Sequence, residues 1–139
     1  MAAFNKFNAF AKDVATKVHN LNSDTLKIIL SNTAISATNA VLADITQIAN
    51  GNGYTTNGTT ATFTSGNQTS GTYKLILADV TFTASGGSVG PFQYAVLYNS
   101  TAASGNLIGW WDYGSAVTVT TGNSFTVDLD GTNGVLTIA

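Results

Sequence analysis

The chain has 139 residues, and only 9% of them are charged, against about 25% in an average globular domain. The sequence contains no arginine, glutamate or cysteine, so lysine, aspartate and one histidine are its only charged or titratable groups besides tyrosine. This small inventory argues against an enzyme, and the absence of cysteine excludes disulfides, thiolate zinc clusters and thiol nucleophiles. A net charge of −2 without any basic cluster argues against nucleic acid as a partner.

The sequence shows no targeting or membrane-spanning segment. Its first residues lack the uninterrupted apolar stretch of a signal peptide, and no later apolar run approaches the roughly 18 residues of a membrane span. We therefore expect no membrane partner. The length predicts a single modest core plus a separate N-terminal element.

Residues 1–22 differ in pattern from the rest of the chain. Their apolar side chains recur at intervals of three and four, which predicts one amphipathic helix of about four turns. The predicted stripe consists of Phe4, Phe7, Ala11, Val14, Val18 and Leu21, with Phe10 at its edge. Two interpretations are open. The helix covers the sheet domain of its own subunit, or it is an arm whose large apolar side chains are assembly contacts with a neighbouring protein.

Residues 23–139 are predicted to form an antiparallel β-sandwich of jelly-roll type. Short segments with a period of two are separated by turns rich in Gly, Asn and Ser, which is typical of sandwiches and barrels. The buried face switches near Ala78 and Asp79, which predicts a bulge or bend there. The expected strands cover 26–30, 60–65, 72–84, 92–99, 107–113, 116–121, 124–128 and 135–138.

Candidate catalytic and metal-binding groups are few. His19 falls at the end of the predicted helix, away from the strand loops, so we interpret it as a capping or surface histidine rather than a triad member. Asp112 could pair with Asp128 or Asp130 for glycoside hydrolysis, although aspartates at strand ends are usually turn residues. The segment 128–133 superficially resembles a calcium loop, but its spacing is wrong and a tight turn is the better interpretation. No metal or cofactor is expected.

The segment Gly109-Trp110-Trp111-Asp112-Tyr113 is the most distinctive local feature. On a strand, Trp110 and Asp112 share one face while Trp111 and Tyr113 share the other, so at least one Trp is expected in the core. The expected core partners are Phe92, Tyr94, Phe125 and Val127. The alternative is a glycan-binding platform made of Trp110, Trp111, Asp112 and Tyr113, in which an exposed indole stacks on a sugar.

Several runs along the chain together resemble small virion structural proteins of tailed bacteriophages. In the first half they are His19-Asn20-Leu21, Asp24-Thr25-Leu26-Lys27-Ile28, Ser31-Asn32-Thr33-Ala34, Val41-Leu42-Ala43-Asp44-Ile45 and Gly51-Asn52-Gly53-Tyr54. In the second half they are Leu77-Ala78-Asp79-Val80-Thr81-Phe82-Thr83-Ala84, Ala95-Val96-Leu97-Tyr98-Asn99 and Leu107-Ile108-Gly109-Trp110-Trp111-Asp112-Tyr113-Gly114.

The resemblance implies a virion component made in the host cytoplasm. The leading expectation is a capsid decoration (cement) protein that binds the major capsid protein on the head surface as a homo-oligomer, with a trimer favoured. A tail or fibre component is the alternative within the same class. A carbohydrate-binding module for host adsorption is the alternative from a different class.

Overall fold

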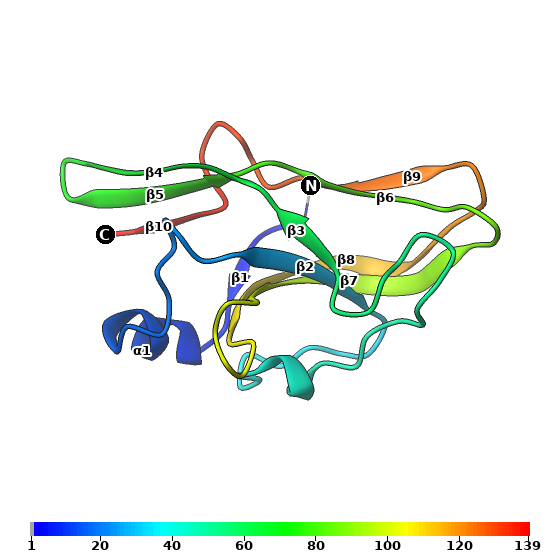
Figure 1. Ribbon diagram of the computed structural model, residues 1–139, viewed down its shortest axis with the longest axis horizontal. Helices are drawn as coiled ribbons and strands as arrows, with labels where there is room; N and C mark the ends of the chain where they lie inside the picture. The colour runs from blue at the N-terminus through cyan, green and yellow to red at the C-terminus, as the bar shows by residue number, and fades with distance from the viewer. Residues whose placement is uncertain (1) are drawn as a thin grey trace.

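The computed structural model describes residues 2–139 and has two layers of antiparallel strands (Figure 1). One layer is a five-stranded sheet in the order β1-β8-β7-β2-β3. Its strands are β1 (Asn5–Lys6), β8 (Leu107–Val119), β7 (Val89–Asn99), β2 (Leu26–Ser31) and β3 (Thr59–Ala61). All of its strand pairs are antiparallel.

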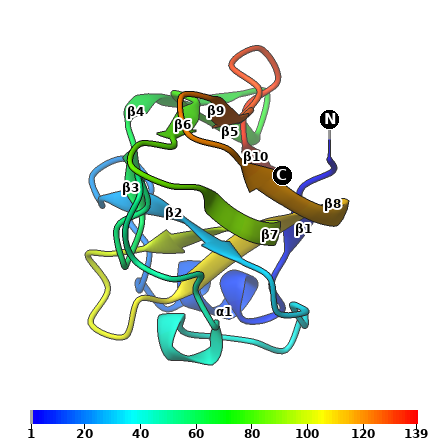
Figure 2. The same ribbon diagram turned by 90° about the vertical axis from the view of Figure 1, so that its right-hand side faces the viewer.

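The second layer consists of two smaller sheets. A three-stranded sheet has the order β10-β5-β4, and β6 pairs with β9. The bounds are β4 (Phe63–Thr69), β5 (Thr72–Leu77), β10 (Leu136–Ile138), β6 (Val80–Thr83) and β9 (Ser124–Val127). These strands form the upper row in Figure 1, and Figure 2 shows β4 and β10 on opposite sides of that row. The prediction of an all-β antiparallel fold is confirmed.

The five-stranded sheet is buried on both faces. In β2, Leu26, Ile28 and Leu30 point into the main core between the layers, whereas Ile29 belongs to a second cluster on the opposite face. That second cluster also contains Phe7 and Ile45. The helix α1 (Ala9–Ala15) and the short 3₁₀ helix η1 (Leu42–Asp44) lie on this outer side of the sheet (Figure 1). Burial of both faces explains why β2 is nearly continuously apolar rather than alternating.

The expected break near Ala78 and Asp79 is present. It divides the predicted strand 72–84 into β5, which ends at Leu77, and β6, which begins at Val80. Leu77 and Val80 are both buried although they are three positions apart. The break restores an inward direction to the side chains that follow it, as the switch in pattern predicted.

The prediction of one four-turn helix in residues 1–22 is wrong. Asn5–Lys6 is instead a strand that pairs with Gly109 and Trp110 of β8, and α1 covers only seven residues. The helix ends soon after Ala15, and Lys17 has a left-handed backbone conformation with φ of 69°. Pairing with the edge of β8 therefore outweighed the helical spacing of the apolar residues. Neither helix within residues 2–139 is long and apolar enough to cross a membrane.

Candidate functional site

The two tryptophans of β8 lie on opposite faces of the five-stranded sheet. Trp111 is only 4% exposed and meets Phe4 edge-on, with ring centroids 5.4 Å apart. Trp110 is half-buried and packs against Phe7 at 4.6 Å. The expectation that at least one Trp belongs to the core is confirmed by Trp111.

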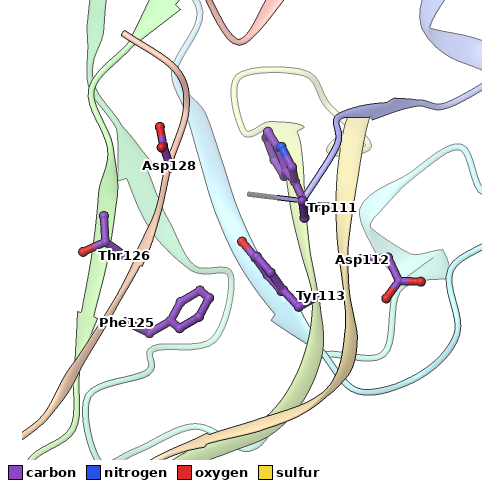
Figure 3. Close-up of a pocket in the computed structure, with 7 residues that line it drawn as sticks. Trp111, Asp112, Tyr113, Phe125, Thr126 and Asp128 are labelled. Carbon is purple, nitrogen blue, oxygen red and sulfur yellow. The ribbon is translucent and has the colours of Figure 1, made fainter.

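The four residues of the predicted glycan platform do not form one surface. Trp111 and Tyr113 point toward β9, whereas the carboxylate of Asp112 points to the other side of β8 (Figure 3). Asp112 accepts hydrogen bonds from Gln93 Nε2 at 2.9 Å and from the backbone N–H of Gly114 at 2.8 Å. These bonds lower the pKa of Asp112 and hold it as a carboxylate in a local turn. The predicted platform is therefore divided between the two faces of one strand.

Between β8 and β9 the structure has an open cleft of about 520 Å³ (Figure 3). Its aromatic floor includes Tyr113 and Phe125, whose ring centroids are 5.0 Å apart in an edge-to-face arrangement. Asp128 adds a carboxylate to the wall, whereas the hydroxyl of Thr126 lies on the other side of β9 and pairs with the hydroxyl of Thr81 at 2.9 Å (Figure 3). The cleft therefore combines half-buried aromatic rings with hydrogen-bonding groups.

The surroundings of this cleft hold Tyr113 in its protonated form. Burial, with a smaller contribution from Asp128, raises the pKa of Tyr113 to about 12, so its phenol stays protonated near neutral pH. The carboxylate of Asp112 lies on the other side of β8 from Tyr113 (Figure 3). Asp112 and Asp128 both contribute to the lining of the cleft, but the Asp112 carboxylate points away from it and accepts hydrogen bonds from Gln93 and Gly114. The two carboxylates therefore do not face one another as an acid–base pair.

The segment 128–133 forms a tight turn before β10. Asp128 accepts a hydrogen bond from the backbone N–H of Asp130 at 2.8 Å. Asp130 in turn accepts from the N–H of Thr132 at 3.2 Å, the N–H of Asn133 at 2.8 Å and the side-chain amide of Asn133 at 3.0 Å. The Asn133 bonds hold the pKa of Asp130 below its ordinary value. In the part of the chain that is described, no three acidic or histidine side chains converge on a metal position.

His19 is buried, which corrects its interpretation as a capping or surface residue. It is 7% exposed, and its ring stacks obliquely on Phe10 with centroids 5.5 Å apart. Its Nδ1 lies 3.0 Å from the side-chain amide of Asn99 at the end of β7. His19 was expected to lie away from the strand loops, but this contact places it beside the C-terminal end of β7.

Asn99 is the centre of this buried polar cluster. Its Oδ1 accepts hydrogen bonds from the N–H groups of Thr101 and Ala102, at 2.9 and 3.2 Å. Its Nδ2 must therefore be the donor, and it donates to Asp24 Oδ2 at 2.6 Å as well as to His19. Nδ1 of His19 is consequently an acceptor, and the proton of the neutral ring sits on Nε2.

The environment of His19 favours this neutral form. Burial lowers the pKa of His19 below its ordinary value, against the opposing attraction of Asp13 and Asp24. Nε2 is buried without a partner among residues 2–139. Asp13, itself 5% exposed, accepts a hydrogen bond from Asn106 at 3.1 Å. The cluster thus joins the N-terminal segment to the β7–β8 connection.

The predicted assembly contacts are mostly inside the chain's own fold. Phe7, Phe10 and Leu21 are 0%, 4% and 8% exposed. Phe4 and Val14 are partly buried and pack against the main core, and Val18 is half-buried. Packing within the same subunit, the first of the two interpretations, accounts for the three buried side chains.

Sequence reasoning did not single out the open edge of β4 as a binding surface. β4 lies at the end of the three-stranded sheet, and Phe63 at its start is 41% exposed, the only large apolar side chain so exposed in the described residues. Residues 45–73 contain no charged side chain; we call this range the uncharged segment. That run of neutral residues is the signal that could have identified the edge.

Comparison with known proteins places the chain in no family. No family model matches it, and no curated protein or solved structure is significantly similar to it.

Proposed function

We propose that the protein is a structural component of a bacteriophage virion, and specifically a capsid decoration protein that binds the major capsid protein. The observation that carries this proposal is the uncharged segment, which folds into exposed loops and the β3 and β4 strands. This surface offers threonine and asparagine hydrogen-bonding groups and an apolar side chain, Phe63. The resemblance to virion proteins supports the same assignment.

A neutral surface of this kind suits a protein that coats a particle. A protein present in many copies on a particle needs a rigid scaffold and contacts that do not depend on the ionic conditions. Contacts made by neutral hydrogen bonds and apolar groups are little weakened by salt, whereas exposed ion pairs are screened. A homo-oligomer, with a trimer favoured, would present several copies of this surface to the lattice at once and strengthen binding by multivalency.

The test is reconstitution on purified heads that lack the protein. We expect the added protein to appear as regular density on the head surface and to remain bound when salt is raised from about 0.1 M to about 1 M. Binding to tails but not heads would move the assignment to a tail component. Failure to bind any part of the particle, or steep release by moderate salt, would overturn the proposal.

A carbohydrate-binding role is the second candidate, and the aromatic cleft between β8 and β9 is the observation that favours it. Tyr113 and Phe125 offer partly open rings, and Asp128 offers a carboxylate that can bind sugar hydroxyls. Replacing Asp128 by Asn removes this charge without enlarging the cleft. Loss of glycan binding or of host adsorption in this variant, with particle stability unchanged, would favour this role over decoration alone.

A further inference from the structure

We propose that β4 is a self-association edge, which pairs antiparallel with β4 of a second copy of this chain across a twofold axis. The two three-stranded sheets would then form one six-stranded sheet. This inference concerns the protein's own assembly, and it proposes a twofold pair in place of the trimer favoured above. It goes beyond the virion role, since the pairing would hold whether or not the copies are bound to a capsid.

The backbone of β4 is available for such pairing. β4 pairs with β5 on one side only, through a two-residue turn at Ser70 and Gly71, whose φ values are 50° and 84°. Two consecutive positive φ values are typical of the tight turn that matches the natural twist of a hairpin. The hairpin extends to one end of the molecule (Figure 1).

Alternate residues of β4 direct their N–H and C=O groups away from β5. Thr69 and Thr72 flank the two-residue turn and pair directly, so the outward-facing residues are Thr64, Gly66 and Gln68. One of these groups already has a partner, because the carbonyl of Gly66 accepts a hydrogen bond from Asn22 Nδ2 at 3.1 Å. A carbonyl oxygen has a second acceptor position, so Gly66 can also accept from a second chain.

β4 has few of the devices that usually protect an open edge. Natural edges carry charged side chains, proline or bulges that prevent pairing with another chain. β8 shows such protection, because beyond Trp110 it is no longer paired with β1 and there it carries the charged residue Asp112. Gly114, with a φ of 83°, then turns the chain. β4 has neither charge nor proline, and its one irregularity lies at its start, between Phe63 and Ser65.

The geometry points to one register. Two antiparallel copies of β4 overlap most fully when Gly66 faces its own counterpart, and this register aligns the outward groups of Thr64 with those of Gln68 in the other copy. It also places Ser65 directly opposite Asn67 of the second copy, on the closely spaced type of pair. Phe63 then lies beside the second copy's hairpin end, which would cover part of its exposed ring.

The first test measures the oligomeric state by sedimentation over a range of concentrations. We expect the wild type to dimerise with rising concentration and the Asn67→Lys variant to lose this dimer, because charges on an edge oppose pairing. Thr118→Lys is the matched control, since Thr118 is an exposed threonine on β8, and it should dimerise like the wild type. A wild type that stays monomeric, or equal loss in both variants, would overturn the proposal.

A second test checks the register and uses the absence of cysteine from the chain. The single variants Ser65→Cys and Asn67→Cys are oxidised alone and as a mixture. The proposed register predicts efficient cross-linking in the mixture and little in either variant alone, because each position faces the other and not itself. Equal cross-linking in all three samples, or none, would contradict the paired edge. Head binding by a protein whose edge fails these tests would leave the virion proposal standing.

Discussion

Asn99 and His19 are 80 positions apart in the chain, yet the side-chain amide of Asn99 donates a hydrogen bond to Nδ1 of His19 at 3.0 Å in the protein interior. The same amide group holds Asp24 and the loop after β7. One buried side chain therefore fixes the position of the N-terminal segment on the sheet and the protonation form of the only histidine.

Replacing Asn99 by Ala should destabilise the protein by about 2–4 kcal/mol, since several buried polar groups would each lose a partner. The free energy of unfolding measured in urea checks this. Asn123→Ala is the control, because Asn123 is exposed and its side chain makes a single local hydrogen bond to Thr120. The control should change stability by no more than about 0.5 kcal/mol. Equal effects in the two variants would contradict a structural role for Asn99.

Stability should fall as the pH drops below the ordinary pKa of histidine. His19 has a lowered pKa in the folded protein, so between its ordinary and its folded pKa the unfolded chain binds a proton that the folded chain does not. The stabilisation by neutral His19 is therefore complete above about pH 6.5 and is lost progressively below it. Protonation would also place an N–H at Nδ1 against the Asn99 amide.

Urea unfolding between about pH 5 and pH 8 measures this effect. The His19→Gln variant serves as the comparison, because glutamine keeps a hydrogen-bonding oxygen but does not titrate. Its stability should depend less on pH in this range than that of the wild type. Parallel pH profiles for the two proteins would show that His19 is not responsible.

The two tryptophans should differ in their effect on stability. Trp111→Ala should cost about 3–5 kcal/mol, because it removes a buried side chain from the main core. Trp110→Ala should cost about 1–2 kcal/mol, since Trp110 is half-buried against Phe7. Chemical unfolding and near-ultraviolet circular dichroism compare the variants. A larger loss from Trp110 than from Trp111 would contradict the burial of Trp111.

Deleting residues 1–21 should prevent the β-domain from folding. The deletion removes β1 from the edge of β8 and takes Phe7, Phe10 and Leu21 out of the core, where each large side chain contributes roughly 1.5–3 kcal/mol. Circular dichroism and thermal unfolding of the truncated chain measure the result. Phe10→Ala in the full chain is the milder companion variant, which should fold with reduced stability. A truncated chain with a native, cooperative transition would restore the interpretation of residues 1–22 as a separate arm.

The strands were predictable where the pattern depends on neighbours in the sequence. Alternation in 72–84, with its change of phase near Ala78, gave both β5 and β6 and the break between them. The prediction of an N-terminal helix was wrong because Phe4 and Phe7, despite their helical spacing, flank the short strand β1. The partner of β1 is β8, which lies 105 residues further along the chain. Local periodicity contains no information about that distant edge.

The candidate sites depended even more on distant contacts. His19 is buried because it packs against Phe10 and contacts Asn99. No motif in the sequence near His19 predicts the contact with Asn99. The glycan platform stays a prediction, and alternation on β8 already indicated that Trp110 and Asp112 lie on one face while Trp111 and Tyr113 lie on the other. Phe125, which completes the aromatic cleft, comes from a different sheet and was expected only as a core partner.

The pairing of β1 with β8 has a consequence for the order of events during synthesis. Asn5 leaves the ribosome 105 residues before its partner Trp110, which at about 5–20 residues per second is a delay of roughly 5–20 s. Throughout that time Phe7 and Phe10 have no sheet to cover them, so the nascent chain exposes apolar groups that chaperones recognise. Final closure of the fold must therefore wait until most of the chain has been translated.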